Sequence, residues 1–375
     1  MELDTSRTQR TFTFSTRVLM ALHMDGPLFL GLCVVGGVGL GILYSAAGGS
    51  PAVVMAQAVK FGLALITMIV LAQLPPRIIR MSAPFLYGLG LILLVVVIFT
   101  GDVSMGAQRW LDLKVVRFQP SEIMKLAVPL FCAWLVHDKP LPPSFVTICV
   151  LAVSILAPVF IIAEQPDLGT ALLVAASGGL VVLFCGLQWQ YLVTAAALGG
   201  GSVPVLWHFL HDYQRQRVLT FLNPQSDPLG AGYHIIQSQI AIGSGGVFGK
   251  GYMNGSQAQL EFLPERSTDF IFAVIGEEWG LIGLTTLLVL YLFVVARGLY
   301  LATTAQDTFS RLVAGSLSAT FFVYVLVNAG MVTGLLPVVG VPLPAVSYGG
   351  TSMVTLMAGF GILMAVTARR KLVRH

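Results

Sequence analysis

The sequence predicts an all-α membrane protein that crosses the bilayer many times. Of its 375 residues, 56% are hydrophobic and only 10% are charged, and the mean hydropathy is +0.85. A soluble domain carries about 25% charged residues, so this composition excludes a water-soluble globule. The apolar residues lie in runs close to the ~20 residues that a helix needs to cross a bilayer. No stretch between the runs is long enough for a soluble domain, and we expect one membrane domain over residues 1–375.

Ten apolar runs, each bounded by polar residues, are the predicted transmembrane helices. The shortest break separates the sixth run from the seventh, where Gly186 and Trp189 mark a turn. Tryptophan suits the membrane interface, which supports a turn at this point. The runs cover approximately residues 27–45, 55–74, 84–100, 121–136, 145–163, 168–184, 191–208, 269–295, 312–335 and 351–367.

The distribution of positive charge predicts the orientation. An even number of spans places both termini on the same side of the membrane. The loops and termini on that side contain twelve Lys and Arg residues, whereas the loops on the other side contain seven. Because cytoplasmic loops carry the excess of positive charge, both termini are expected in the cytoplasm. Residues 1–26 are then a cytoplasmic leader, either a helix lying in the interface or an unstructured segment, without the apolar core of a signal peptide. Residues 368–375 are a basic cytoplasmic tail.

One outward connection, between the seventh and eighth spans, is far longer than the others. It covers residues 212–268, which is 57 residues. Connections longer than ~15 residues are usually functional or disordered. This one carries apolar side chains, including Tyr233, Ile235 and Phe262, that can pack against the membrane helices. We expect a large ordered extracytoplasmic loop over a cavity.

Charged residues near or inside the spans are functional candidates, because each costs at least about 2.5–3.5 kcal/mol at the bilayer centre. The first group leads into the fourth span, where Glu122 suits the first helical turn and Lys125 lies one turn deeper on the same face. These two residues could form an ion pair that only orders the helix end. Arg109 and Arg117, however, add more positive charge than one carboxylate neutralises.

Two further groups lie on the same outward side. Asp167 directly precedes the sixth span, so that helix capping alone could explain it, whereas Glu164 has no such explanation. Ser267 is a natural N-cap that would place Asp269 in the first turn of the eighth span, where a carboxylate also has a structural explanation. Further charged residues surround Asp269 in the sequence, namely Glu261, Glu265, Arg266, Glu277 and Glu278.

Together these groups predict an outward-facing cavity with several cations and a few carboxylates at membrane depth. Cations there suit the anionic head group of a lipid, such as a diphosphate. A carboxylate beside it could act as a general base, taking a proton from an attacking hydroxyl while the diphosphate leaves.

Other kinds of site have weaker support. The glycine-rich stretch 243–249 lacks the Lys-Ser/Thr ending of a P-loop, and His208 and His211 have only Asp212 as a neighbouring carboxylate ligand. The four cysteines lie inside apolar runs, which indicates neither disulfides nor a metal cluster. The net charge of +4 shows no basic stripe, so no nucleic-acid partner is expected.

The outward segments resemble those of the SEDS family (shape, elongation, division and sporulation). The resemblance extends over nearly the whole chain. The sequence motifs DYQRQRV and PERSTDFIFAV favour the rod-elongation branch of the family over its division branch. The matching stretches are GAQRWLDL with RFQPSE within 106–122, EQPDLGTA at 164–171, DYQRQRV with FLNPQSDPLGAGYHIIQSQIAIGSGG within 212–246, FLPERSTDFIFAVIGEE at 262–278 and PVVGVPLPAVSYGGTSM at 337–353.

This resemblance implies a ten-span peptidoglycan glycosyltransferase in the bacterial cytoplasmic (inner) membrane. Such an enzyme polymerises lipid II at the outer face during elongation and rod-shape maintenance, and it releases undecaprenyl diphosphate. The resemblance also implies a class B penicillin-binding protein as the transpeptidase partner, other elongation-complex proteins, and a divalent cation, Mg²⁺ or Mn²⁺, whose ligands the sequence does not place.

The resemblance further implies roles for individual residues. Asp269, the Asp of the TDF motif, is the implied catalytic residue. Glu265 and Arg266 flank it and are added as substrate-binding candidates. The substrate-binding residues implied by the matching motifs are Arg109, Arg117, Glu122, Lys125, Gln165 and Asp167.

The expected reaction uses Asp269 to deprotonate the C4 hydroxyl of the acceptor GlcNAc, which attacks the anomeric carbon of the donor MurNAc with inversion. Arg109, Arg117 and Lys125 would hold the leaving diphosphate. A helix N-terminus and nearby cations lower the pKa of a carboxyl group, whereas desolvation raises it. The sequence alone leaves that balance open.

Two other functions were weighed. A lipid II flippase also carries charges inside its spans, but here the charged groups crowd the outer side and no inverted repeat is evident. Lys60 is the exception, and it could instead extend toward an interface. A non-catalytic scaffold would not explain why so many ionisable residues face one cavity.

Overall fold

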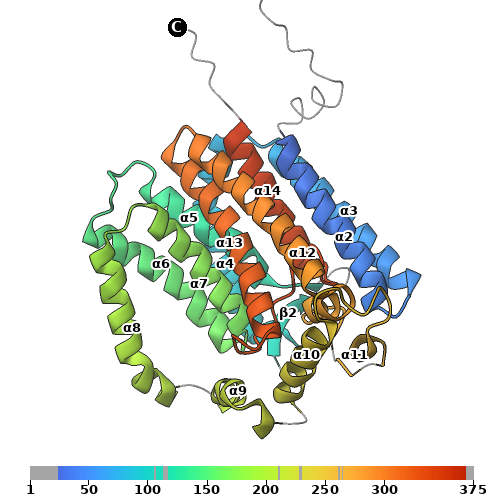
Figure 1. The fold of residues 1–375 in the computed structure, drawn as a ribbon. Coiled ribbons are helices and arrows are strands. Elements are labelled where there is room, and N and C mark those ends of the chain that lie inside the picture. Colours follow the sequence, from blue (N-terminus) through green and yellow to red (C-terminus); the bar gives the residue numbers. More distant parts are fainter. Residues whose placement is uncertain are drawn as a thin grey trace, which may run out of the picture.

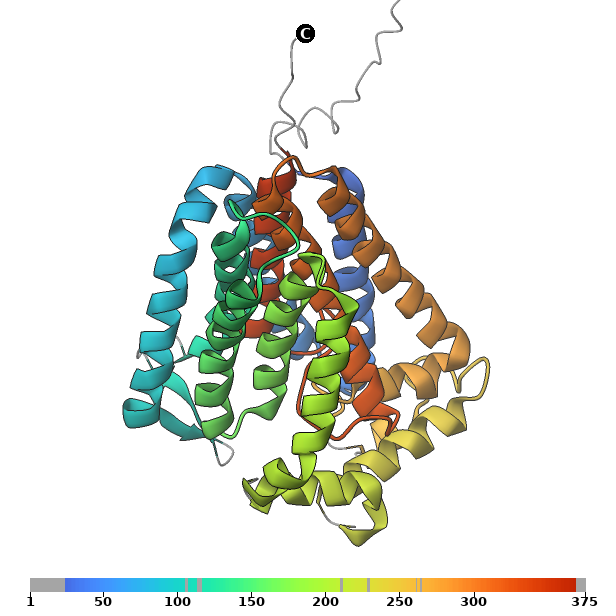
Figure 2. The same ribbon diagram turned by 90° about the vertical axis from the view of Figure 1, so that its left-hand side faces the viewer.

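The computed structural model describes residues 24–368 with gaps at 105–106, 113–116, 210–211, 228–229, 261 and 264. Long helices run side by side, and three shorter helices gather at one end of the bundle (Figure 1). The same end carries the shorter helices in the turned view (Figure 2). The long helices are α2 (Gly26–Ala46), α3 (Pro51–Ala72), α4 (Pro76–Thr100), α5 (Pro120–Val136), α6 (Phe145–Glu164), α7 (Leu168–Phe184), α8 (Trp189–Phe209), α12 (Ile271–Thr304), α13 (Thr308–Val332) and α14 (Thr351–Ala368).

A helix covers each of the ten apolar runs, and seven of these helices are long and apolar enough to cross a membrane. Those seven are α2, α3, α4, α6, α12, α13 and α14, and α7 is a shorter apolar helix. The prediction of a nearly all-helical, multi-pass membrane protein is confirmed. The exact number of ten spans remains a prediction.

The helix α13 is the core of the bundle, because it packs against α5, α7, α12 and α14. Small side chains allow the close approach of neighbouring helices in a membrane protein. Ser318 of α13 meets Gly298 of α12, where a Cβ would lie within 2.2 Å of the serine hydroxyl. The closely packed centre holds the helix ends that build the site.

A small antiparallel sheet, which the sequence did not predict, joins α4 to α5. Its strands β1 (Asp102–Ser104), β2 (Ala107–Asp112) and β3 (Arg117–Phe118) are ordered β1-β2-β3. Leu111 pairs with Phe118 in the β2–β3 ladder. The sheet therefore carries Arg109 on a paired strand at the entrance to α5.

The helix α12 is interrupted at Gly280, whose φ of 65° and ψ of −159° are not helical. We predicted a single uninterrupted span here. A break frees backbone groups that must find partners where water is scarce, and the segment 246–251 supplies them. The bonds run from the N–H groups of Leu281, Ile282, Lys250 and Gly251 to the carbonyls of Gly246, Val247, Glu277 and Glu278 at 2.9 to 3.2 Å.

The segment 212–268 is thereby tied to α12. Its described part contains α9 (Asp212–Leu222), the 3-10 turn Pro224–Ser226, α10 (Ala231–Gly245) and α11 (Ser256–Gln259). Gly249 is required for the close approach, because a Cβ there would lie 2.1 Å from the carbonyl oxygen of Glu278.

Candidate active site

A cavity of about 570 Å³ lies where the N-termini of four helices meet. The helices are α5, α7, α12 and α14. Their first residues, together with the segment before α14, form the walls. The lining residues are Arg109, Trp110, Gln119, Glu122, Lys125, Asp167, Thr170, Leu173, Glu265, Ser267, Thr268, Asp269, Tyr324, Gly340, Val341, Pro342, Tyr348, Gly349, Gly350, Thr351 and Ser352.

The ion pair predicted on α5 is present at the wall of this cavity. The helix begins at Pro120, and Nζ of Lys125 lies 2.6 Å from Oε1 of Glu122. Nζ of Lys125 also lies 5.3 Å from the ring centre of Tyr324 on α13. Oε2 of Glu122 is buried and has no hydrogen-bond partner among the described residues. The pair therefore orders the helix end and also leaves one buried carboxylate oxygen without a partner among the described residues.

Asp167 caps α7, but capping is only one of its contacts. Its Oδ1 accepts from the backbone N–H of Thr170 at 3.2 Å, and its Oδ2 accepts from the side-chain amide of Gln119 at 2.8 Å. Nη1 of Arg109 lies 3.7 Å from Oδ1 of the same carboxylate. Asp167 therefore links α7 to the segment leading into α5 and to strand β2, so capping alone does not explain it.

Asp269 lies in a turn before α12, with its carboxylate against the backbone of Gly340. A Cβ on Gly340 would lie 3.4 Å from Oδ2 of Asp269. Burial, and after it the charge of Glu265, raise the pKa of Asp269 to about 7. The sequence left this balance open, and in the structure desolvation outweighs the helix N-terminus and the cations.

The prediction that Ser267 caps the helix and places Asp269 in its first turn was wrong. The helix begins at Ile271, and Phe270 precedes it. Residues 265–270 form a turn instead, in which the N–H of Phe270 donates to the carbonyl of Glu265 at 3.3 Å. Asp269 therefore lies outside the helix.

Some of the predicted site residues are placed elsewhere. Gln165 is 4% exposed and donates to the carbonyl of Leu94 at 2.8 Å, so it holds the turn against α4. Arg266 donates to the carbonyl of Ala258. Neither Gln165 nor Arg266 lines the cavity. Arg117 belongs to β3, but its side chain lies outside the described residues, as does Glu261.

Glu277 is fully buried on α12 and binds the end of the long connection. Its Oε1 lies 2.8 Å from Nζ of Lys250 and accepts from the N–H of Gln257, and its Oε2 accepts from the N–H of Ala258. This carboxylate holds α11 in place and does not line the cavity.

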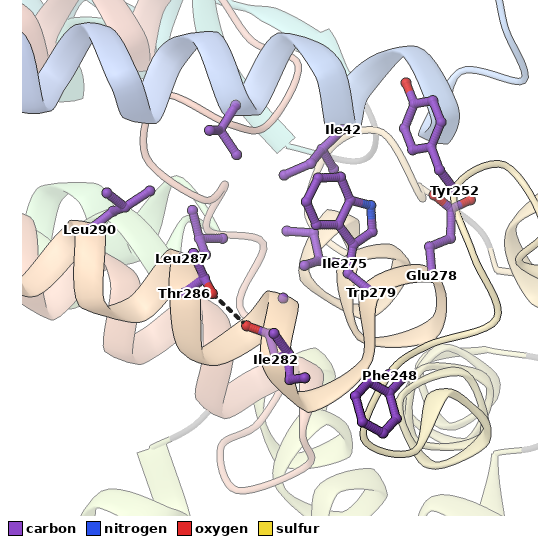
Figure 3. Close-up of a pocket in the computed structure, with 12 residues that line it drawn as sticks. Ile42, Phe248, Tyr252, Ile275, Glu278, Trp279, Ile282, Thr286, Leu287 and Leu290 are labelled. Carbon is purple, nitrogen blue, oxygen red and sulfur yellow. Dashed lines mark hydrogen bonds between the residues drawn. The ribbon is translucent and has the colours of Figure 1, made fainter.

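Glu278 points into a separate, mostly apolar groove of about 490 Å³ between α2 and α12 (Figure 3). Ser45 of α2 donates to Oε1 of Glu278, and Tyr252 lies close to the carboxylate in the same view. Ile42, Trp279 and other apolar side chains form the rest of the groove. The two neighbouring glutamates thus serve different parts of the fold.

Lys60 lies against the segment that lines the cavity before α14. Its Nζ lies 3.8 Å from the ring centre of Tyr348, and Gly350 packs against its side-chain carbons. Lys60 thus supports the segment before α14 from the side of α3.

Several residues that line the cavity, such as Tyr324, or bind a segment that lines it, such as Asn328, were not singled out in the sequence. Tyr324 and Asn328 belong to an apolar run, and polar side chains inside a span were the signal that could have identified them. Tyr348 belongs to the PVVGVPLPAVSYGGTSM stretch, which carried the resemblance but no assigned role. Gln119 directly precedes α5, where its pairing with Asp167 depends on tertiary structure.

The described residues contain no group of three or more His, Cys, Asp or Glu side chains that could hold a metal ion. Glu122 and Asp167 are already bound to Lys125 and Gln119. In this part of the chain the donor set does not fit a resident metal site, and no step below involves a metal.

Comparison with known proteins gives matches over most of the chain. Residues 17–372 match the family of cell cycle proteins FtsW, RodA and SpoVE. The peptidoglycan glycosyltransferase MrdB of Escherichia coli (strain K12) is 52% identical over 352 residues, which is 94% of this chain and 95% of that protein.

Solved structures show the same fold. A chain from a study of how a peptidoglycan synthase complex coordinates polymerization and crosslinking is 34% identical, with a TM-score of 0.82 over 93% of this chain and 98% of that chain. The rod shape determining protein RodA of Thermus thermophilus is 30% identical, with a TM-score of 0.70 over 92% of this chain and 96% of that chain.

Proposed function

Because the chain belongs to the family of cell cycle proteins FtsW, RodA and SpoVE, we propose that the cavity beside Asp269 is its catalytic site. The chain is a peptidoglycan glycosyltransferase of cell elongation in the inner membrane. Its substrate in this proposal is lipid II, which is polymerised into glycan strands at the outer face with release of undecaprenyl diphosphate.

The observation that carries this proposal is the meeting of four helix N-termini, two cations and the carboxyl of Asp269 around one cavity, which Glu122, Asp167 and Glu265 also line. Helix N-termini favour anions because their free N–H groups and dipoles point at the ligand. Arg109 and Lys125 line the same cavity. A diphosphate fits this wall, and Asp269 lies where a base can reach the attacking sugar.

Unsatisfied polar atoms at the wall also support a polar ligand. Buried polar atoms in proteins nearly always have a hydrogen-bond partner. Among the described residues, three cavity-lining atoms lack one: Nε of Arg109, Oε2 of Glu122 and Oγ of Ser352. Because these atoms are themselves buried, the phosphate and sugar hydroxyl groups of a substrate can pair with them only if the wall opens around them.

The proposed reaction begins when the Asp269 carboxylate takes the proton from the C4 hydroxyl of the acceptor GlcNAc. The oxygen then attacks the anomeric carbon of the donor MurNAc with inversion. A new C–O glycosidic bond forms, and the bond from that carbon to the diphosphate oxygen breaks with its electron pair. With a pKa of about 7, Asp269 can hold the proton at neutral pH and release it again.

The other candidates have supporting roles. Arg109 and Lys125 hold the leaving diphosphate, with Arg117 as a third cation inferred from the resemblance. Glu122 orients Lys125, and Asp167 orients Arg109 and Gln119. We keep the predicted substrate contact for Glu265, which lines the cavity. For Gln165 and Arg266 we propose that they act through the segments that they hold.

We further propose that α5, α7 and α8 also cross the membrane, which gives ten spans with both termini in the cytoplasm. A class B penicillin-binding protein is the proposed partner, because a similar chain belongs to a peptidoglycan synthase complex. Other elongation-complex proteins and a requirement for Mg²⁺ or Mn²⁺ remain proposals that the resemblance implies.

The test is polymerisation of labelled lipid II by the purified protein, with and without the penicillin-binding partner, in the presence of Mg²⁺ or Mn²⁺. Glycan chains from the wild type and none from an equally folded Asp269→Ala variant are expected. Lipid II that crosses liposome membranes without any polymer would point to a flippase instead.

A further inference from the structure

Three consecutive backbone carbonyls before α12 are each bound by a group from a distant part of the chain. The carbonyl of Ser267 accepts from the N–H of Tyr348 at 2.8 Å, and that of Thr268 accepts from the hydroxyl of Ser347. The carbonyl of Asp269 accepts from the side-chain amide of Asn328 at 2.9 Å. We call these three donors the carbonyl clamp.

Asn328 has the central position in the carbonyl clamp. It lies on α13, is 0% exposed, and donates its second amide hydrogen to the carbonyl of Val341 at 2.7 Å. Val341 follows Gly340, against which the Asp269 carboxylate lies. One amide nitrogen therefore joins the backbone of Asp269 to the wall that its carboxylate faces.

We propose that Asn328 is a positioning residue that fixes the Asp269 carboxylate in the cavity by binding the carbonyls of Asp269 and Val341 together. The inference rests on the proposed function of Asp269 and assigns it a support that no motif identified. Only a side-chain amide supplies two donors from one nitrogen without a charge. Without it, two buried carbonyls would lack their partner, which favours a rearrangement of both segments.

The rest of the carbonyl clamp is held from the opposite side by α3. Gln57, which is 1% exposed, donates to the carbonyl of Ser347 at 3.1 Å and accepts from the N–H of Gly349 at 3.2 Å. The hydroxyl of Ser347 in turn accepts from the N–H of Leu343 at 2.8 Å. Gln57 on α3 thus holds the segment at Ser347. Asn328 on α13 holds the carbonyls of Asp269 and Val341.

Loss of the Asn328 hydrogen bonds should also change the pKa of Asp269, because burial is the main cause of the raised pKa of this carboxyl group. A carboxylate that moves toward water has a lower pKa. None of the surrounding groups is changed by a substitution at Asn328. The titratable groups that face Asp269 or its turn are Glu265 on the same turn, Arg109, Glu122, Lys125, Asp167, Tyr324 and Tyr348 across the cavity, and His234, which stacks on Phe270.

The experiment measures kcat, KM for lipid II and the pH dependence of kcat/KM, which reports the pKa of the free enzyme, for Asn328→Ala and Asn328→Asp in complex with the penicillin-binding partner. We expect kcat to fall about 10- to 100-fold, as a misplacement near 1 Å can cause, while KM stays within about twofold. The midpoint of the acid limb should move from about 7 to lower pH for Asn328→Ala. The near-isosteric Asn328→Asp should lose a similar part of kcat, because a carboxyl donates at most one hydrogen bond when protonated and none when ionised, and cannot bind both carbonyls.

Val325→Ala is the matched control, because Val325 is 2% exposed on the same helix and supplies none of the three donors of the carbonyl clamp. It should lower Tm by as much as Asn328→Ala while keeping kcat and the acid limb. Equal losses in kcat for Val325→Ala, wild-type kcat for Asn328→Asp, or an unmoved acid limb for Asn328→Ala would each overturn the inference. Full activity of Asp269→Asn would instead overturn the proposed function, so the two failures are distinguishable.

Discussion

Nζ of Lys125 lies 2.6 Å from Oε1 of Glu122, and each of the two side chains is only 6% exposed. The pair lies one turn inside α5 and lines the cavity. An ion pair this deeply buried is costly to break, because removal of one partner leaves the other charge without compensation. The same pair is therefore both a stability element and part of the proposed diphosphate site.

Substitution of Lys125 by methionine should destabilise the protein strongly. The free energy of unfolding is expected to fall by about 3–5 kcal/mol, because the Glu122 carboxylate then remains buried and unpaired. The double variant Glu122→Gln, Lys125→Met should be more stable than Lys125→Met alone. Thermal unfolding of the purified variants measures this, and additive losses in the double variant would contradict the account.

The rate of polymerisation should depend on pH through Asp269. Its pKa is raised to about 7 by burial, and a general base must be deprotonated to accept a proton. The value of kcat/KM for lipid II, which reports the pKa of the free enzyme, should therefore rise as the pH increases from 6 to 8, with a midpoint of about 7. A kcat/KM that is flat from pH 5 to 8 would show that a carboxyl group with an ordinary pKa, or none, is rate-determining.

The raised pKa of Asp269 also predicts a stability effect. A carboxyl whose pKa is higher in the folded than in the unfolded protein binds more protons when folded, so stability falls as pH rises between the two values. Asp269→Asn removes that cost, and its Tm should exceed that of the wild type increasingly from pH 4 to about 7. Identical Tm differences at pH 4.5 and pH 8 would refute a desolvated Asp269.

Glu277 should hold the segment 246–259 on α12. Its buried carboxylate binds the ammonium group of Lys250 and two backbone N–H groups at the start of α11. Glu277→Ala is expected to make this segment sensitive to limited proteolysis. Glu278→Ala is the matched control, since that carboxylate contacts Ser45 on α2, and equal cleavage in both variants would argue against the specific role.

Much of the helical framework follows from hydrophobic runs together with the residues at their ends. The seventeen residues of α7 have the predicted bounds, because Asp167 caps its first turn and Gly186 follows its end. The α5 start was equally predictable, since Pro120 and Glu122 have strong positional preferences in a first turn. These signals lie in the residues at each helix end, so they can be identified from the sequence without knowledge of the fold.

The features that failed depend on contacts between distant segments. The turn before α12 overrides the capping preference of Ser267, because the carbonyls of Ser267 and Thr268 are bound by the segment at Ser347 and Tyr348. The break at Gly280 exists because segment 246–251 satisfies the freed backbone groups. The spacing of hydrophobic residues within one helix contains no information about hydrogen-bond partners in distant segments. The separate destinations of Glu277 and Glu278 have the same cause.

The most direct test of the proposed catalytic site is the initial rate of lipid II polymerisation by Asp269→Asn at pH 8, in complex with the penicillin-binding partner. The variant is nearly isosteric and removes only the ability to accept a proton, so Tm should be equal to or above that of the wild type. The account predicts a loss of kcat of at least about 100-fold, since general-base catalysis contributes typically 10²–10⁴-fold. A folded Asp269→Asn protein that polymerises lipid II near the wild-type rate would contradict it.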